Sequence, residues 1–264
     1  MRDEFVETKP ESCRFFEGLT RQLKGVRPND RFDDLSEDQI KKAKKRKFTN
    51  LANGHEGNGV VAYAFKCASC SRCVPIRINL AKARLTSNQH RILKKHDAVF
   101  DVDIFKNNGI YSMDELRVFA AYHRFKELFE EGATDTLSET TQNSHTMLIH
   151  NKEHNHLVGQ LYLDISAEDR AINMASHMYD PTINPDASLG TYMWLKIIQT
   201  ALHPCSGIDY IYPGAWARDG KNLDYKKRFP GLETIVDGEW VDFDPEIHTR
   251  APSLPPLVSI PEIP

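Results

Sequence analysis

Apolar positions recur along this chain with two different periods, and each period predicts its own kind of element. Tyr192, Leu195 and Ile198 recur at helical spacing, which predicts a helix over Gly190–Leu202. A second apolar stripe predicts a longer helix over Met113–Glu131. Alternating or continuous apolar runs predict strands at Val60–Phe65, Pro75–Leu80, Thr146–His150, Leu157–Ile165, Ala171–Tyr179 and Ile208–Tyr212.

The polar segments between these runs complete the outline. A helix is predicted around Ser36–Lys47, with cations on most of its circumference, and a basic helix begins after Thr86 or Ser87 as its N-cap. Tyr225–Phe229 is predicted as a short helix or turn. The six prolines after Asp242 predict an extended, surface-wrapping tail. Strand pairs, then strand–helix–strand, then more β structure form the order of an α+β protein.

Composition narrows the class of protein. The chain has 264 residues, of which 40% are hydrophobic and 27% charged, which suits a folded protein of one large or two modest domains. No run of about 18 apolar residues occurs, so we expect no membrane-spanning helix. The charged first ten residues carry no secretory signal, and five cysteines in such a chain predict reduced thiols in the cytoplasm. Secreted and integral-membrane proteins are therefore not expected.

Charge is distributed very unevenly along the chain. The net charge is −3, yet residues 1–100 sum to +9 and residues 101–264 to −12. Residues 41–100 alone hold 14 basic and 2 acidic side chains. Such polarity favours a basic face that binds nucleic acid or another polyanion. The alternative is that the two halves attract each other.

The cysteines have the spacing of a metal site. Cys67, Cys70 and Cys73 form a C-x2-C-x2-C turn, in which three thiolates can converge on one ion. Cys13 is the best candidate for a fourth ligand. The site could hold zinc or an iron–sulfur cluster; the alternative is a reduced, metal-free turn packed against the preceding strand.

One predicted helix begins with residues suited to binding an anion. Ser188, Gly190 and Thr191 stand at the start of the helix over Gly190–Leu202, where backbone N–H groups could bind an oxyanion, a phosphate or a carboxylate. The alternative is an ordinary N-cap. No Walker-type loop, no G-x-G-x-x-G and no G-x-S-x-G is present in the sequence, so ATP hydrolysis, dinucleotide redox chemistry and a serine nucleophile are not supported.

Short motifs follow one another along nearly the whole chain, and their order resembles that of the aminoacyl-tRNA–protein transferases of the N-degron pathway. The pattern is similar to the compact bacterial aspartate/glutamate leucyltransferases and more distantly to the arginyltransferases. Each motif is weak alone, but together they are specific. The motifs are Cys67-x-x-Cys70-x-x-Cys73-Val74-Pro75-Ile76-Arg77, Ser87-x-Gln89-x-Arg91, Tyr179-Asp180-Pro181, Ser188-Leu189-Gly190-Thr191, Tyr225-Lys226-x-x-Phe229 and Glu233.

The resemblance implies a fold and a division of the chain. Residues 1–105 would form a basic, cysteine-containing domain, and residues 106–264 an acyltransferase domain of the N-acetyltransferase (GNAT) type. The chain departs from the family's pattern at Ala215–Ala217, at Asn222-Leu223, at Phe119, at Lys126-Glu127 and at Ser176. Several of these positions should line the substrate groove.

The resemblance also implies a reaction, in which an aminoacyl group moves from its tRNA ester to the α-amine of a protein that begins with Asp or Glu and so marks it for degradation. Because the ester is already activated, no cofactor is required. Asp180 would orient the incoming ammonium or take its proton through water; the alternative is a turn-forming Asp. The N–H groups near Gly190, with Ser188 and Thr191, would bind the carbonyl or the tRNA 3′ end.

Further residues would bind the two substrates. Arg77 and Lys226 would bind the acidic first side chain of the acceptor, with Tyr225 and Tyr179 beside it. Leucine is favoured over arginine as the transferred amino acid. Cations would contact the tRNA phosphates: Lys41, Lys42, Lys44, Lys45, Arg46, Lys47, Arg84, Arg91, Lys94 and Lys95.

Two other functions remain open at this point. The first is an aminoacyl-tRNA-dependent transferase that acts on a small molecule or a biosynthetic peptide, which the altered Ala215–Ala217 segment would permit. The second is a catalytically silent relative that binds RNA or senses redox state through its cysteines.

Overall fold

A computed structural model describes residues 72–126, 143–167, 169–183, 188–220, 223–236 and 239–248. Nearer the N-terminus it describes the backbone of five short strands, of which β1 (Phe5–Glu7), β4 (Leu23–Val26) and β5 (Val61–Phe65) form one antiparallel sheet. The strands β2 (Glu11–Ser12) and β3 (Thr20–Arg21) pair with each other.

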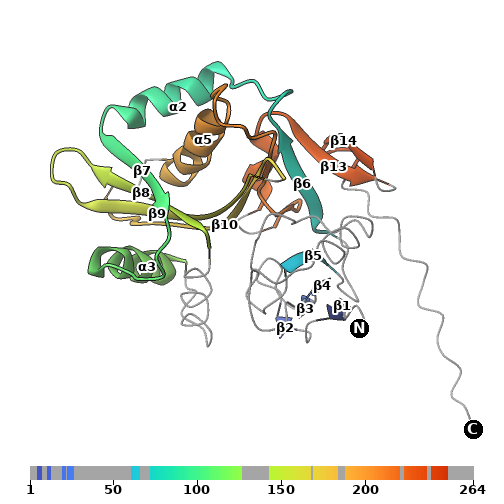
Figure 1. Cartoon of the computed structure of the whole chain (residues 1–264), viewed down its shortest axis with the longest axis horizontal. Coiled ribbons are helices and arrows are strands. Elements are labelled where there is room, and N and C mark those ends of the chain that lie inside the picture. The colour runs from blue at the N-terminus through green and yellow to red at the C-terminus, as the bar shows by residue number, and fades with distance from the viewer. Residues whose placement is uncertain are drawn as a thin grey trace, which may run out of the picture.

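A nine-stranded sheet organises the rest of the described chain (Figure 1). Its order is β14-β13-β6-β11-β10-β9-β8-β7, with β12 paired to β6. The strands are β6 (Val74–Asn79), β7 (Phe100–Lys106), β8 (His145–Asn151), β9 (Leu157–Ser166), β10 (Ala171–Tyr179), β11 (Tyr210–Tyr212), β12 (Ala215–Trp216), β13 (Leu232–Val236) and β14 (Glu239–Asp242).

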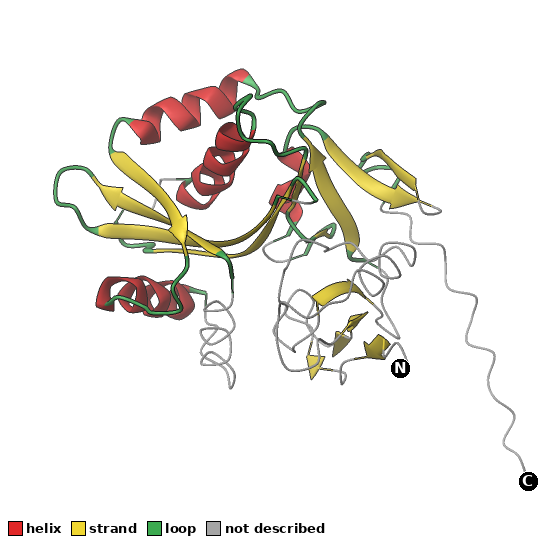
Figure 2. Ribbon diagram, in the orientation of Figure 1, coloured by secondary structure: helices red, strands yellow, loops and turns green. Residues whose placement is uncertain are grey.

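Helices cover both faces of this sheet (Figure 2). Helices α2 (Ser87–Asp97) and α5 (Leu189–Ala201) lie on one face, and α3 (Met113–Phe125) lies on the other. Thr86 and Ser112 cap α2 and α3, and each forms a capping box with the residue three positions on, Gln89 or Glu115. The main core joins α2 and α5 to the sheet, and a smaller core beneath α3 includes Val118, Phe119, Tyr162 and Met178.

The sheet contains one parallel pair of strands, β10 and β11, and they are paired over only the first part of β10. Strand β10 pairs with β11 only over Ala171–Asn173, opposite Tyr210–Tyr212, and then continues to Tyr179. Helix α5 connects the two strands, as a parallel connection requires. A register shift between Met174 and Ser176 marks where β10 changes course against β9. The carboxyl end of β10 therefore lies beside α5 and α3, with no pairing to β11 among the described residues.

Most predicted elements are confirmed, including all six predicted strands and the helix at residue 190. The predicted helix at 113–131 is described as far as Phe125, where Lys126 is its C-cap. The sequence pattern missed β7, an edge strand whose residues are mostly exposed. The predicted helix at 36–47 and the tail beyond 248 lie outside the described residues.

The predicted boundary between two domains at residue 105 does not coincide with a boundary of the sheet. Strand β6 precedes that boundary, yet it pairs with β11 and β13, which follow it. Val74–Asn79 therefore belongs to the same sheet as the predicted transferase domain, although the division into two domains itself stays a prediction. The described helices include none that is long and apolar enough to cross a membrane.

Candidate active site

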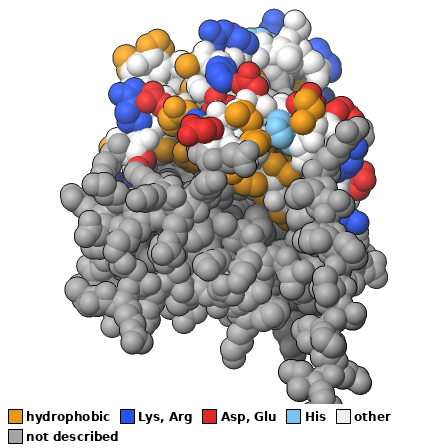
Figure 3. All heavy atoms as spheres, turned by 90° about the vertical axis from the view of Figure 1, so that its right-hand side faces the viewer, with side chains coloured by type: hydrophobic (Ala, Val, Ile, Leu, Met, Phe, Trp, Pro, Cys, Tyr) orange, Lys and Arg blue, Asp and Glu red, His pale blue; other side chains and the backbone are white. Residues whose placement is uncertain are grey.

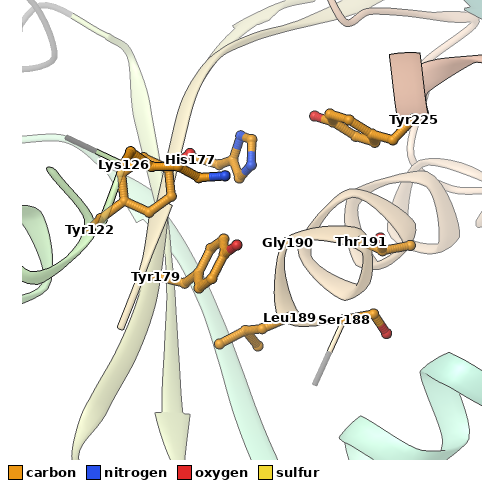
Figure 4. Close-up of a pocket in the computed structure, with 9 residues that line it drawn as sticks. All are labelled: Tyr122, Lys126, His177, Tyr179, Ser188, Leu189, Gly190, Thr191 and Tyr225. Atoms are coloured by element: carbon orange, nitrogen blue, oxygen red, sulfur yellow. The ribbon is translucent and has the colours of Figure 1, made fainter. Parts of the chain in front are cut away.

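A cavity of about 170 Å³ opens where β10 and β11 separate. Four elements supply its walls (Figure 4). Helix α3 and strand β10 form one side, and the start of α5 with the short 3₁₀ helix η2 (Asp224–Arg228) forms the other. The lining residues are Tyr122, Lys126, His177, Tyr179, Ser188, Leu189, Gly190, Thr191 and Tyr225.

The first turn of α5 presents backbone N–H groups at this cavity. Ser188 is its N-cap, but its side chain makes no capping hydrogen bond. The N–H groups at the start of a helix have no partner within the helix, and they carry the positive end of its dipole. The confirmed helix start and its place in the cavity agree with the predicted binding of a carbonyl oxygen or another anionic group.

Gly190 lets β10 approach this helix start closely. A Cβ atom at Gly190 would lie 3.2 Å from Cε1 of Tyr179 and 3.6 Å from Nε2 of His177. The first distance is tighter than ordinary van der Waals contact and the second is an ordinary one, so a Cβ here would press on the Tyr179 ring alone. The missing Cβ therefore keeps the floor of the cavity open.

His177 lies at the centre of an aromatic group. Its ring meets Trp194 edge-on at 5.7 Å between centroids and lies 6.2 Å from Tyr122. Burial, together with the charges of Lys226 and Lys126, lowers the pKa of His177 to about 4. At neutral pH the imidazole is therefore uncharged and keeps one nitrogen as an acceptor.

The three tyrosines of the cavity are neutral phenols. Burial raises the pKa of Tyr122, Tyr179 and Tyr225 above the ordinary range. Tyr122 and Tyr179 meet edge-on at 5.2 Å, and the buried hydroxyl of Tyr225 donates no hydrogen bond to a described residue. Each hydroxyl can therefore donate a hydrogen bond to a bound substrate.

Lys126 brings a cation to the cavity from the end of α3. Its ammonium lies 5.9 Å from the ring of Tyr122, and burial lowers its pKa. The described lining residues include no carboxylate. The uncapped helix start, the phenols and Lys126 thus make the cavity suited to negative charge.

Asp180 lies next to the cavity lining rather than in it. Its carboxylate accepts hydrogen bonds from Arg117 Nη1 at 2.8 Å and from the N–H and hydroxyl of Thr182 at 3.0 and 2.6 Å. Burial would raise the pKa of Asp180, but these partners outweigh it and hold that pKa below its usual range. Its hydrogen-bonding capacity is used to fix the turn after β10, which fits the turn-forming alternative better than proton transfer.

Arg77 and Lys226 are also absent from the residues that line the cavity. Arg77 is clamped between the rings of Tyr210 and Trp240, at 4.0 and 4.3 Å, and pairs with Glu233 at 2.7 Å. The buried Lys226 donates to the carbonyls of Pro213 and Ala215, at 2.6 and 3.0 Å. Their predicted contact with an acceptor stays a prediction; the contacts present hold β6, β11, β12 and η2 together.

Exposed cations lie along α2, close to the element that supplies Tyr225. Gln89 Nε2 donates to the carbonyl of Arg228 at 2.9 Å, which ties the start of α2 to η2. Lysine and arginine side chains gather at the upper end of the molecule in Figure 3, the end at which α2 lies in Figure 1. Of the predicted tRNA contacts, four are described and exposed: Arg84, Arg91, Lys94 and Lys95.

The remaining predicted residues lie mostly outside the described chain. These are the stretch 41–47 and three of the four cysteines, Cys13, Cys67 and Cys70; only Cys73 is described, half-buried. Within the described ranges no group of three or more His, Cys, Asp or Glu side chains could hold a metal ion. The cysteine site therefore stays a prediction.

The structure thus brings five predicted residues into one cavity and adds others that the sequence analysis did not assign to the site. Ser188, Gly190, Thr191, Tyr179 and Tyr225 line it as predicted. Lys126, one of the departures expected to line the substrate groove, is also in the lining, whereas Tyr122 and His177 were missed. His177 could have been found from the strand period, because residues 177 and 179 share one face of β10.

Comparison with known proteins shows which family the part of the chain around this cavity resembles. Residues 113–236 match the family model of the arginine-tRNA-protein transferase C terminus, and this segment contains every residue that lines the cavity. The predicted family is confirmed: the chain resembles the aminoacyl-tRNA–protein transferases. With it the enzyme class, an aminoacyltransferase that uses aminoacyl-tRNA, is confirmed.

The relatives of this transferase cover most of its length. The aspartate/glutamate leucyltransferase of Dinoroseobacter shibae is 25% identical over 94% of this chain and 86% of its own. The enzyme of the same name from Ruegeria pomeroyi is 28% identical over 71% of this chain and 69% of its own. Among solved structures, a tandem GNAT protein from the clavulanic acid biosynthesis pathway is 11% identical and covers 62% of this chain and 52% of its own, with a TM-score of 0.36. That score is too low to assign a fold family, so the mixed α and β architecture stands and the GNAT type stays a prediction.

Proposed function

We propose that this transferase moves leucine from leucyl-tRNA to the α-amine of proteins that begin with Asp or Glu, and so marks them for degradation. The observation that carries the proposal is the cavity at the separation of β10 and β11, where an uncapped helix start, neutral phenols and one lysine converge without a described carboxylate. The names of the relatives agree with this choice of substrates.

The reaction requires little chemical assistance from the protein. The amine nitrogen forms a bond to the ester carbonyl carbon, the bond from that carbon to the ribose oxygen breaks, and one proton passes from the amine to the ribose oxygen. An α-amine has a pKa of about 7.7–8.0, and a cationic cavity lowers it, so the nucleophilic form is readily reached. The protein therefore acts mainly by orientation and by stabilising the oxyanion.

Gly190 and its neighbours suit the oxyanion. The N–H groups at the start of α5 can donate to the carbonyl oxygen as it gains charge, and so can the hydroxyl of Tyr225, which donates to no described residue. Removing one such donor in other enzymes costs about 10²–10³-fold in rate. The tRNA 3′ end would then lie between the α5 start and η2, on the side where α2 carries its exposed cations.

The charge of the cavity favours leucine over arginine as the transferred amino acid. A guanidinium would need a carboxylate partner, and the described lining offers none, whereas Lys126 would repel it. Leu189 and the tyrosine rings offer apolar contact to a leucyl side chain. Lys126 is better suited to the carboxylate of the acceptor's first residue, and we assign that contact to it.

The test is transfer from tRNA charged separately with leucine and with arginine to peptides that begin with Asp, Glu or Asn. We expect leucine on the Asp and Glu peptides and little on the Asn peptide. Arginine as the better donor would overturn the choice of amino acid. Transfer to a non-protein acceptor alone, or binding of tRNA without transfer, would favour the other two functions named above.

A further inference from the structure

We propose that His177 is a catalytic residue: its imidazole takes the proton that the acceptor's α-amine releases on attacking the ester, and passes it to the departing ribose oxygen. This inference rests on the function proposed above and deepens it. It concerns a residue that none of the sequence motifs includes.

The ring of His177 lies where the two reacting groups would meet. Nε2 of His177 lies 3.6 Å from the place a Cβ would take on Gly190, so the ring lies directly beside the first turn of α5 in the cavity lining. Figure 4 shows the side chains of Tyr122, Lys126 and Tyr225 directed toward the same ring from the other walls. A carbonyl held by the first turn of α5 would therefore have the His177 ring beside it, within reach of an attacking amine.

Few of the groups that line the cavity can accept a proton. The backbone N–H groups and Lys126 only donate hydrogen bonds, and the phenols of Tyr122, Tyr179 and Tyr225 are weak bases. Asp180 is fully engaged with Arg117 and Thr182. No hydrogen bond to either ring nitrogen of His177 is present within the described ranges. Of the described lining groups, this imidazole is therefore the one suited to accept a proton.

The charges around His177 favour its neutral imidazole, so the ring would carry a transferred proton only briefly. Lys126 of α3 and Lys226 of η2 both disfavour the imidazolium, as does burial, and they hold the pKa at about 4. The other titratable groups that face the ring are the neutral Tyr122, Tyr179 and Tyr225. The ammonium becomes more acidic once its nitrogen is bonded to the carbonyl carbon, and an imidazolium of low pKa passes the proton on readily to the ribose oxygen. Each turnover leaves His177 as it began.

Packing alone is the competing explanation, because His177 meets Trp194 edge-on. His177→Phe keeps an aromatic ring against Trp194 but removes the proton acceptor, and His177→Gln keeps polarity without basicity. His145, a half-buried histidine outside the cavity, provides the control variant His145→Gln.

The experiment measures leucine transfer by the full-length protein to an Asp-initiated peptide, and separately to hydroxylamine, which is uncharged at neutral pH and far less dependent on a base. We expect both His177 variants to lose about 10²–10⁴-fold in kcat with the peptide. The KM for leucyl-tRNA should stay within about twofold, the loss with hydroxylamine should be under about tenfold, and His145→Gln should behave as the unaltered protein.

Near-normal kcat in His177→Phe, or equal losses with peptide and hydroxylamine, would overturn the relay and leave a packing role. Should His177→Phe fail to fold, as judged by its melting temperature, His177→Gln decides by the same comparison. Absence of leucine transfer in the unaltered protein would instead overturn the proposed function, so the two failures are distinguishable.

Discussion

At the scale of single residues, one missing Cβ atom sets the shape of the site. Gly190 occupies the first turn of α5, where a glycine normally costs helix stability, yet its absent side chain is what leaves room for the ring of Tyr179. Stability and function therefore oppose each other at this position, which makes it easy to test.

Gly190→Ala should lower leucine transfer at least tenfold, because the new methyl group presses on Tyr179 at 3.2 Å and narrows the cavity. The free energy of unfolding should change by no more than about 1 kcal/mol, since better helix propensity offsets the contact. Gly207 is the matched control: it has φ of +69° and open space around it. Gly207→Ala should lower stability and leave transfer intact, the opposite pattern, as measured by urea unfolding and a transfer assay.

Lys126→Gln tests the charge that faces the acceptor. We expect the preference for Asp- and Glu-initiated peptides over an Asn-initiated one to fall by about tenfold, the loss of roughly one charge-assisted contact. Binding of leucyl-tRNA should change little. Competition between the three peptides in one reaction measures the preference, and an unaltered ratio would place the acidic side chain elsewhere.

Asp180→Asn tests a turn that positions the end of β10. The carboxyl has a folded pKa below its unfolded value of about 3.9, so its contribution to stability is complete above that value and is lost as the pH falls through the folded pKa. We expect the variant to be less stable by about 1–2 kcal/mol at pH 7, because Arg117 is partly exposed and counts for less. Urea unfolding should show the gap closing below about pH 4; a constant gap would contradict the ionised pair.

Among the elements, the decisive feature is the early separation of β10 from β11. The apolar pattern predicted β10 and α5 correctly, since both have a strong period and α5 begins at a serine. It could not predict that β11 would pair with β10 over Ala171–Asn173 alone, because pairing length is set by contacts distant in sequence. Tyr122 was missed for the same reason: only the tertiary packing of α3 brings it to the end of β10.

The short helix η2 was predicted, but the part its lysine plays was not. Lys226 follows Tyr225 directly, and a sequence cannot say which of the two side chains faces the substrate. The structure turns the ring to the cavity and buries the ammonium on two backbone carbonyls. A cation in a motif can therefore serve the fold as readily as a substrate.

Lys226→Met should consequently act on the whole element. We expect a loss of stability of about 1–3 kcal/mol, because two carbonyls lose their charged donor, and a similar fall in transfer to Asp, Glu and Asn peptides. Thermal unfolding and the three-peptide competition measure the two effects. Unchanged stability with a selective loss of the acidic peptides would restore the predicted contact between Lys226 and the acceptor.

Over the whole molecule, the uneven charge seen in the sequence is reflected in a basic helix on the surface. The exposed Arg91, Lys94 and Lys95 lie on α2, which Gln89 ties to η2 beside the cavity. A tRNA that reaches across α2 could deliver its 3′ end to the start of α5.

Lys94→Gln with Lys95→Gln should weaken tRNA binding and make it less dependent on salt. Each phosphate contact contributes roughly 0.7–0.9 to the slope of log affinity against log salt, so the double variant should lose about 1.4–1.8. The control removes two exposed cations elsewhere, Lys106→Gln with Arg170→Gln, and should leave the slope unchanged. Equal effects of both pairs would mean that net charge, rather than α2, governs binding.

The most direct test of the central claim is a single-turnover transfer from labelled leucyl-tRNA to an Asp-initiated peptide, with the unaltered protein and Gly190→Ala compared at saturating tRNA. We predict that leucine appears on the peptide's α-amine and that the variant binds the tRNA normally but transfers at least tenfold more slowly. Equal rates in the two proteins, with folding and tRNA binding intact, would show that the aminoacyl ester and the amine do not meet in this cavity.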